Sequence, residues 1–136
     1  MKTISHHAAL VYIMVVVSAA DGSMSDRELQ AIGELTKKLP IFRDFDHDRL
    51  LVLAQDCSAI LQEKDGLAAV FGLVKEALPA PLRETAYWLA LEIALTDTQV
   101  ALEEVRVLGT IRRALGLDRL VAAALERGAR ARYQVS

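Results

Sequence analysis

Apolar residues along this chain recur at helical spacing, and no segment alternates in the manner of a strand. Segment 4–20 is almost continuously apolar, which predicts a central, buried helix. Segment 25–39 carries its apolar residues on one helical face: Leu29, Ile32, Leu35 and Leu39. Five further helices are expected, at about 46–62, from Asp65-Gly66 to about 78, at about 79–95, at about 100–115, and from Asp118 into the tail.

The residues between these segments support the same division. Asp21-Gly22 ends the first helix, Pro40 stops the second, and Gly116 ends the sixth. The pattern Ser25-x-x-Glu28 is typical of a capping box at a helix start.

Composition favours helices as well. The 136 residues are 53% hydrophobic but only 5% aromatic, so the apolar content is mostly Ala, Leu and Val. This length fits one domain, residues 1–136. We therefore predict an all-α fold, a single compact bundle of about seven helices.

Charge and cysteine content limit the classes of function. A formal net charge of −2 gives no overall attraction to nucleic acid or to an anionic membrane, and neither is expected as a partner. The single Cys57 has no partner for an internal disulfide, and its apolar neighbours predict a buried thiol. This fits a reducing compartment, and we expect the cytoplasm.

The first helix has a second interpretation. Lys2, the apolar run 8–17 and Ser18-Ala19-Ala20 imitate a secretory signal with a small-residue cleavage site. The run is too short to span a bilayer, so no transmembrane segment is expected. An internal repeat favours a core helix over a cleaved leader.

The repeat has an offset of 76 residues, which places Asp21 over Asp97 and Glu28 over Glu104. Apolar positions match too, such as Val17 with Ile93. The chain is thus expected to form two pseudo-symmetric helical hairpins that cover each other's apolar faces. Gly33 and Gly109 also coincide, which suggests close helix–helix approach at both, with chance as the alternative.

Segment 19–28, with Ala19-Ala20-Asp21-Gly22 and then Glu28, resembles the hallmark of the TerB-like tellurite-resistance family. Segment 96–104 resembles the family's second acidic loop, although Asp97-Thr98 replaces Asp-Gly. The resemblance covers nearly the whole chain. It implies an all-helical fold of about seven helices, an association with tellurite resistance and stress responses, and a cation site in the acidic loops.

Four carboxylates are the candidate metal ligands: Asp21, Glu28, Asp97 and Glu104. Hard cations such as Ca²⁺ and Mg²⁺ require several oxygen ligands, and these four can supply them if the two hairpins bring them together. The alternative is that they only cap helices, as the capping box explains Glu28. In the second copy Ala101 replaces Ser25, yet Glu104 remains.

Other candidates for chemistry are weaker. Asp44-x-Asp46-x-Asp48 opens like an EF-hand loop but lacks the required Gly, with Arg49 in its place. The histidines and the one cysteine do not form a soft-metal motif: His6, His7, His47 and Cys57. The basic tail is expected to be a solvated helix end: Arg127, Arg130 and Arg132.

No nucleophile is paired in sequence with a base and oxyanion donors, so we expect no enzyme. The function expected is that of a non-enzymatic TerB-like module that binds a divalent cation and acts through protein partners. The alternative is a metal-free interaction or scaffold domain. The sequence leaves the partner, the ion and the oligomeric state open, a homo-oligomer included.

Overall fold

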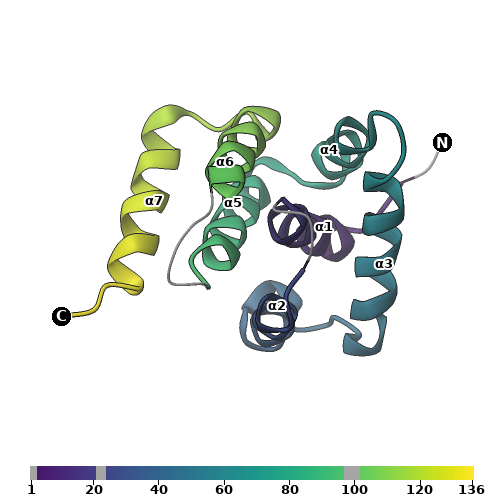
Figure 1. Cartoon of the computed structure of the whole chain (residues 1–136), viewed down its shortest axis with the longest axis horizontal. Coiled ribbons are helices and arrows are strands. Elements are labelled where there is room, and N and C mark those ends of the chain that lie inside the picture. Colours follow the sequence, from purple (N-terminus) through teal and green to yellow (C-terminus); the bar gives the residue numbers. More distant parts are fainter. Residues whose placement is uncertain (1–2, 21–23, 97–101) are drawn as a thin grey trace.

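The computed structural model describes residues 3–20, 24–96 and 102–136 (Figure 1). This part of the chain is all-helical, as predicted, and holds no strand. Its α-helices are α1 His6–Ala19, α2 Asp26–Lys38, α3 Leu50–Leu61, α4 Gly66–Ala77, α5 Ala80–Ala94, α6 Leu102–Leu115 and α7 Arg119–Arg132. Two short 3-10 turns, η1 Pro40–Phe42 and η2 His47–Arg49, lie between α2 and α3.

Helix α1 is the centre of the molecule, as its apolar sequence predicts. Residues 8–18 are all buried, and α1 packs against α3, α4, α5 and α6. Figure 1 shows α1 surrounded by the other helices, with α7 on one side of the molecule and α3 on the opposite side. Burying each large aliphatic side chain contributes about 1.5–3 kcal/mol, so α1 is a main source of stability.

The two predicted hairpins are α1–α2 and α5–α6. Shifting Lys38, the last residue of α2, by 76 positions gives Ala114, one residue before α6 ends at Leu115. The same shift carries Ala19, the last residue of α1, to Leu95, the residue directly after α5. The repeat in the sequence is therefore a repeat of helix boundaries in the structure.

The paired glycines do not behave as predicted. A Cβ atom placed on Gly33 would find Leu50 Cδ2 as its nearest neighbour at 4.0 Å, which is ordinary contact. On Gly109 it would meet the flexible end of Arg113 at 3.4 Å. The expectation of close helix–helix approach at these two sites is therefore wrong, because the nearest atoms leave room for a methyl group.

A close approach occurs instead at Gly66. A Cβ atom there would clash with the carbonyl oxygen of Ile60, which is backbone and cannot move aside cheaply. Asp65 takes the left-handed conformation at this turn, with φ 57°, and α4 begins at Gly66. At the end of α6, Gly116 has φ 70°, as expected of a helix-ending glycine.

The third helix begins later than its acidic start suggested, at Leu50 rather than near Asp46. Asp46 caps the 3-10 turn η2 instead, where its side chain accepts from the Asp48 backbone N–H at 3.0 Å. Phe42 and Phe45 are buried in this connector and hold it against the core. Aromatic burial thus fixes the segment between the two longer helices.

Candidate functional site

Glu28 lies in the first turn of α2, and its residue is only 3% exposed. Its Oε1 accepts from the Ser25 backbone N–H at 3.0 Å, and Ser25 Oγ accepts from the Glu28 N–H at 3.1 Å. The capping box predicted from the sequence is therefore present. It uses one of the two carboxylate oxygens of Glu28.

Glu104 occupies the equivalent place in the second hairpin. It lies in the first turn of α6 and is also 3% exposed. Carboxylates are rarely this buried, because removing the charge from water costs several kcal/mol unless hydrogen bonds or opposite charges offset it. The equal burial of Glu28 and Glu104 makes these two positions the best candidate site.

The other two predicted ligands, Asp21 and Asp97, lie outside the described residues. Within residues 3–20, 24–96 and 102–136, no group of three or more His, Cys, Asp or Glu side chains is arranged to hold a metal ion. The four-carboxylate site therefore stays a prediction, with two of its members placed.

A third buried carboxylate was not predicted from the sequence. Glu92 on α5 is 3% exposed, and Arg132 at the end of α7 donates from Nε to Glu92 Oε1 at 2.7 Å. The hydrogen bond to Glu92 raises the pKa of Arg132. An acid within the apolar run of α5 was the available signal, but a partner 40 residues away cannot be read from local spacing.

Cys57 is buried and free, as expected. Its Sγ lies 3.8 Å from the Tyr12 carbonyl oxygen, and burial raises the pKa of the thiol to about 12. At neutral pH the group is a thiol rather than the thiolate that nucleophilic or metal chemistry requires. Cys57 therefore acts as a small apolar core residue.

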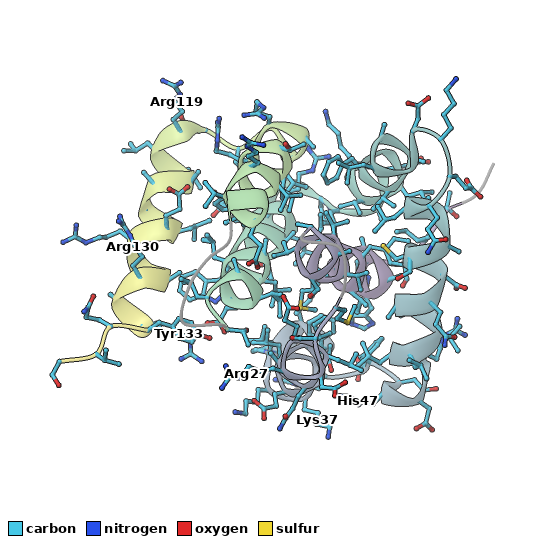
Figure 2. All side chains as sticks on the ribbon, in the orientation of Figure 1. Arg27, Lys37, His47, Arg119, Arg130 and Tyr133 are labelled. Carbon is cyan, nitrogen blue, oxygen red and sulfur yellow. The ribbon has the colours of Figure 1, made fainter. Side chains whose placement is uncertain are left out.

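The histidines anchor the connector between α2 and α3. His7 Nε2 donates to the Ile41 carbonyl at 2.7 Å, and the His7 ring stacks on Phe42 with 5.5 Å between centroids. His47 is exposed at the surface (Figure 2), and its Nε2 donates to the Thr36 carbonyl at 2.9 Å. Both imidazoles satisfy backbone acceptors that would otherwise lack a partner.

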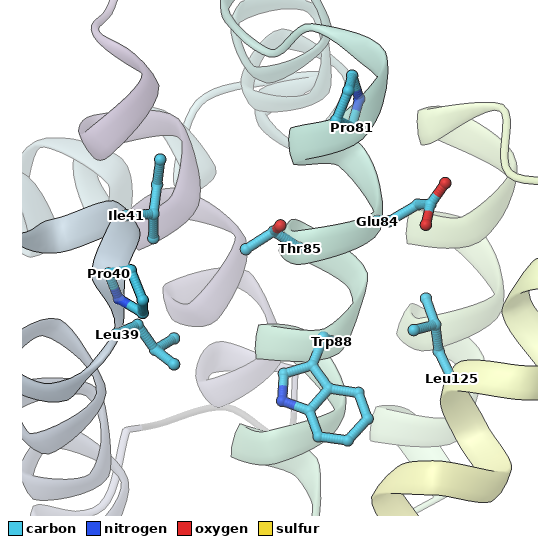
Figure 3. Close-up of a pocket in the computed structure, with 8 residues that line it drawn as sticks. All are labelled: Leu39, Pro40, Ile41, Pro81, Glu84, Thr85, Trp88 and Leu125. Atoms are coloured by element: carbon cyan, nitrogen blue, oxygen red, sulfur yellow. The ribbon is translucent and has the colours of Figure 1, made fainter.

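One hollow in the described part of the chain is mainly apolar and has a volume of about 450 Å³. Figure 3 shows Trp88 between Leu39 on one side and Leu125 on the other. Glu84 and Thr85 supply polar atoms to its lining. Figure 3 shows the Glu84 and Thr85 side chains pointing to opposite sides of α5.

The fold and the site together define a class of protein: an all-helical domain with two related hairpins. In each hairpin the second helix has a buried glutamate in its first turn. The family model described as Tellurite resistance protein TerB matches residues 7–126, which is most of the chain. The chain belongs to the TerB family, and the resemblance found in its sequence is confirmed. Comparisons with curated proteins and with solved structures gave no match. Among the described residues, no helix has both the length and the apolar character needed to cross a membrane.

Proposed function

We propose that this chain is a non-enzymatic TerB module that binds Ca²⁺ or Mg²⁺ through Asp21, Glu28, Asp97 and Glu104. We also propose that it acts in the cytoplasm through protein partners, in tellurite resistance or a related stress response. The observation that carries the proposal is the burial of Glu28 and Glu104 at equivalent positions of the two hairpins in a TerB chain.

The physical argument is one of charge. Two buried carboxylates at helix starts gain from the positive end of each helix dipole, by up to about 2 kcal/mol per group in partly buried geometries, and Glu28 also accepts a hydrogen bond from Ser25. A divalent cation offsets the cost of burial more fully and accepts oxygen ligands from both hairpins. The aspartates that precede each glutamate by seven residues would complete the set.

The capping box favours the alternative for the first hairpin. Because Glu28 already accepts from the Ser25 N–H, its place in α2 has an explanation that requires no metal. In that case the protein is a metal-free scaffold, and binding of partners is its whole function.

Calorimetric titration with Ca²⁺ and Mg²⁺, paired with thermal unfolding, separates the two. We expect saturable binding and a higher Tm, since a ligand at a hundredfold excess over its Kd stabilises by about 2.7 kcal/mol. The variant Glu28→Gln/Glu104→Gln should lose both the binding and the rise in Tm, because glutamine carries no charge. Glutamine can still cap the helix, so the fold should be kept. Asp44→Asn/Asp46→Asn is the matched control and should keep both, since it removes two exposed acids of the connector.

If Ca²⁺ and Mg²⁺ leave the Tm of the wild type unchanged, only the metal-free scaffold function would remain. The same rise in the double glutamine variant would place the ion elsewhere. Retention of a specific protein from cell extract by the immobilised full chain tests the shared claim about partners, and failure to retain any would count against both versions.

A further inference from the structure

Positive charge gathers in the last quarter of the chain. Residues 105–136 hold seven arginines and two acids, a formal charge of +5, whereas residues 1–104 hold nine basic and sixteen acidic residues, a charge of −7. This basic segment forms most of α6 and all of α7. Figure 2 shows Arg119 and Arg130 along α7, at the side of the molecule opposite α3.

A groove with a volume of about 390 Å³ lies where α5, α6 and α7 meet. Its apolar lining comes from α5, α6 and the residue directly after α5: Leu91, Ala94, Leu95, Val105 and Leu108. Gly109 adds a position with no side chain, and Val105 is 54% exposed. Arg112 on α6 and Arg130 on α7 supply the positive charge of the groove.

The charges in this groove are available to a partner. Within the described residues, neither Arg112 nor Arg130 makes a hydrogen bond or an ion pair. The one acid in the lining, Glu126, accepts a hydrogen bond from the Tyr87 hydroxyl at 2.7 Å. An incoming carboxylate therefore meets two guanidinium groups that make no hydrogen bond or ion pair among the described residues, and their two positive charges exceed the single negative charge of Glu126.

We propose that the α5–α6–α7 groove binds an amphipathic helix of a partner protein, with aliphatic side chains on the floor and carboxylates on Arg112 and Arg130. This inference rests on the proposed function through protein partners and names the chemistry of the partner. Helix-in-groove recognition uses an apolar floor of this kind, and guanidinium groups bind carboxylates with paired hydrogen bonds.

Nucleic acid fits the groove less well. Binding of single strands relies on exposed aromatic rings for stacking, but the groove floor is aliphatic and the Tyr87 ring is buried. Duplex binding relies on many phosphate contacts, whereas two arginines line this groove. An acidic amphipathic helix of a protein fits both the aliphatic floor of the groove and its positive charges.

The test uses the isotope-labelled full chain and a synthetic peptide of about 16 residues, built from Leu, Ala and Glu with Leu on one helical face. We expect saturable amide shifts confined to α5, α6 and α7. The same peptide with Lys in place of Glu, and a scrambled peptide of equal composition, should bind at least about tenfold more weakly.

Two pairs of variants locate the binding. Arg112→Glu/Arg130→Glu should weaken it at least about tenfold, and Arg43→Glu/Arg49→Glu, with the same charge change on the connector, should not. Gly109→Leu fills the groove without changing charge, and it should abolish binding while keeping the fold, since leucine is a better helix former than glycine. Its control is Gly72→Leu on the exposed side of α4, where a Cβ atom meets nothing within 4 Å.

The proposal is overturned if the acidic peptide does not bind the wild type, or if Gly109→Leu binds it as well as Gly72→Leu does. It is also overturned if a 20-nucleotide single strand or duplex shifts the same amides at lower concentration than the peptide. Cation titration and protein retention from extract, measured on the same preparation, report on the proposed function separately. Failure of the peptide alone therefore removes the groove and leaves that function standing.

Discussion

Gly66 and Gly33 differ in what their backbones face. At Gly66 the backbone lies against the Ile60 carbonyl, so the site has no space for a side chain. At Gly33, inside α2, a methyl group would make ordinary contact with Leu50. The first glycine is required by packing, and the second costs helix stability without a steric reason.

We therefore expect opposite effects of alanine. Gly66→Ala should lower the free energy of unfolding by about 1–3 kcal/mol, because backbone must shift to admit the Cβ atom. Gly33→Ala should raise it by about 0.5–1 kcal/mol through better helix propensity. Urea unfolding followed by circular dichroism measures both, and equal effects of the two substitutions would contradict this account.

We expect the Cys57 thiol to react with a disulfide reagent only when the protein unfolds. With its pKa raised to about 12 by burial, the native thiol should resist a disulfide reagent at pH 8 and react at once in concentrated guanidinium. The neutral thiol is the form that the fold favours. Its contribution to stability is thus full below the unfolded pKa of about 8.5 and is lost as pH rises towards about 12.

Urea midpoints at pH 8 and pH 10.5 measure that loss, which Cys57→Ala should reduce. Rapid stoichiometric labelling of the native protein at pH 8 would show that the thiol is accessible and would refute the burial argument.

Helix α7 is attached to α5 by small residues and two polar contacts. Ala122 and Ala129 are buried, and a Cβ atom on Gly128 would lie 3.3 Å from the Trp88 ring, so small side chains let the helices approach. The Tyr87 hydroxyl donates a hydrogen bond to Glu126. At the last turn of α7, Arg132 forms an ion pair with Glu92. The docking of α7 therefore combines close apolar packing with two polar contacts between residues far apart in sequence.

Removing the Arg132 guanidinium should loosen the end of α7. Arg132→Met leaves the Glu92 charge buried, but Arg132 is itself 57% exposed, so we expect a loss of about 1–2 kcal/mol rather than the full cost of a buried charge. Hydrogen exchange of the α7 amides should accelerate. Glu92→Leu/Arg132→Met should recover part of the loss, and Arg127→Met, an exposed change in the same helix, should have little effect. If the double variant is less stable than Arg132→Met, the buried charge is not the cause.

At the scale of single helices, the sequence predicts the features that depend on neighbouring residues. The spacing of Leu29, Ile32 and Leu35 predicted α2, and Ser25-x-x-Glu28 predicted its cap, since both depend on neighbours within one or two turns. Helical structure does begin after Asp46, which caps η2, but its first turn is 3-10, so α3 itself starts only at Leu50. The Glu92–Arg132 pair was missed because tertiary packing brings its members together.

At the scale of the whole molecule, the arrangement of the two hairpins reflects the internal repeat, and both copies of the repeat can be recognised in the sequence. The repeat predicted two hairpins. The structure adds that Glu28 and Glu104, which the repeat aligns, are equally buried, because equivalent positions in a repeated unit meet equivalent surroundings. The distances among the four candidate ligands were not predictable, since they depend on how the hairpins pack. Asp21 and Asp97 lie outside the described residues, so the convergence of the site remains a prediction.

One shared core predicts one cooperative transition. Helix α1 belongs to the first hairpin but packs against α5 and α6 of the second, so neither hairpin can unfold without exposing the other's apolar face. The single Trp88 reports on α5, and the single Cys57 reports on α3. Fluorescence of Trp88 and labelling of Cys57 should therefore give the same urea midpoint. Ile13→Val, a change at a fully buried site of α1, should lower both midpoints equally, by the equivalent of about 0.5–1.5 kcal/mol. Two separate midpoints, or a shift in only one probe, would mean that the hairpins are independent folding units, and the cation site that depends on their joint packing would lose its structural basis.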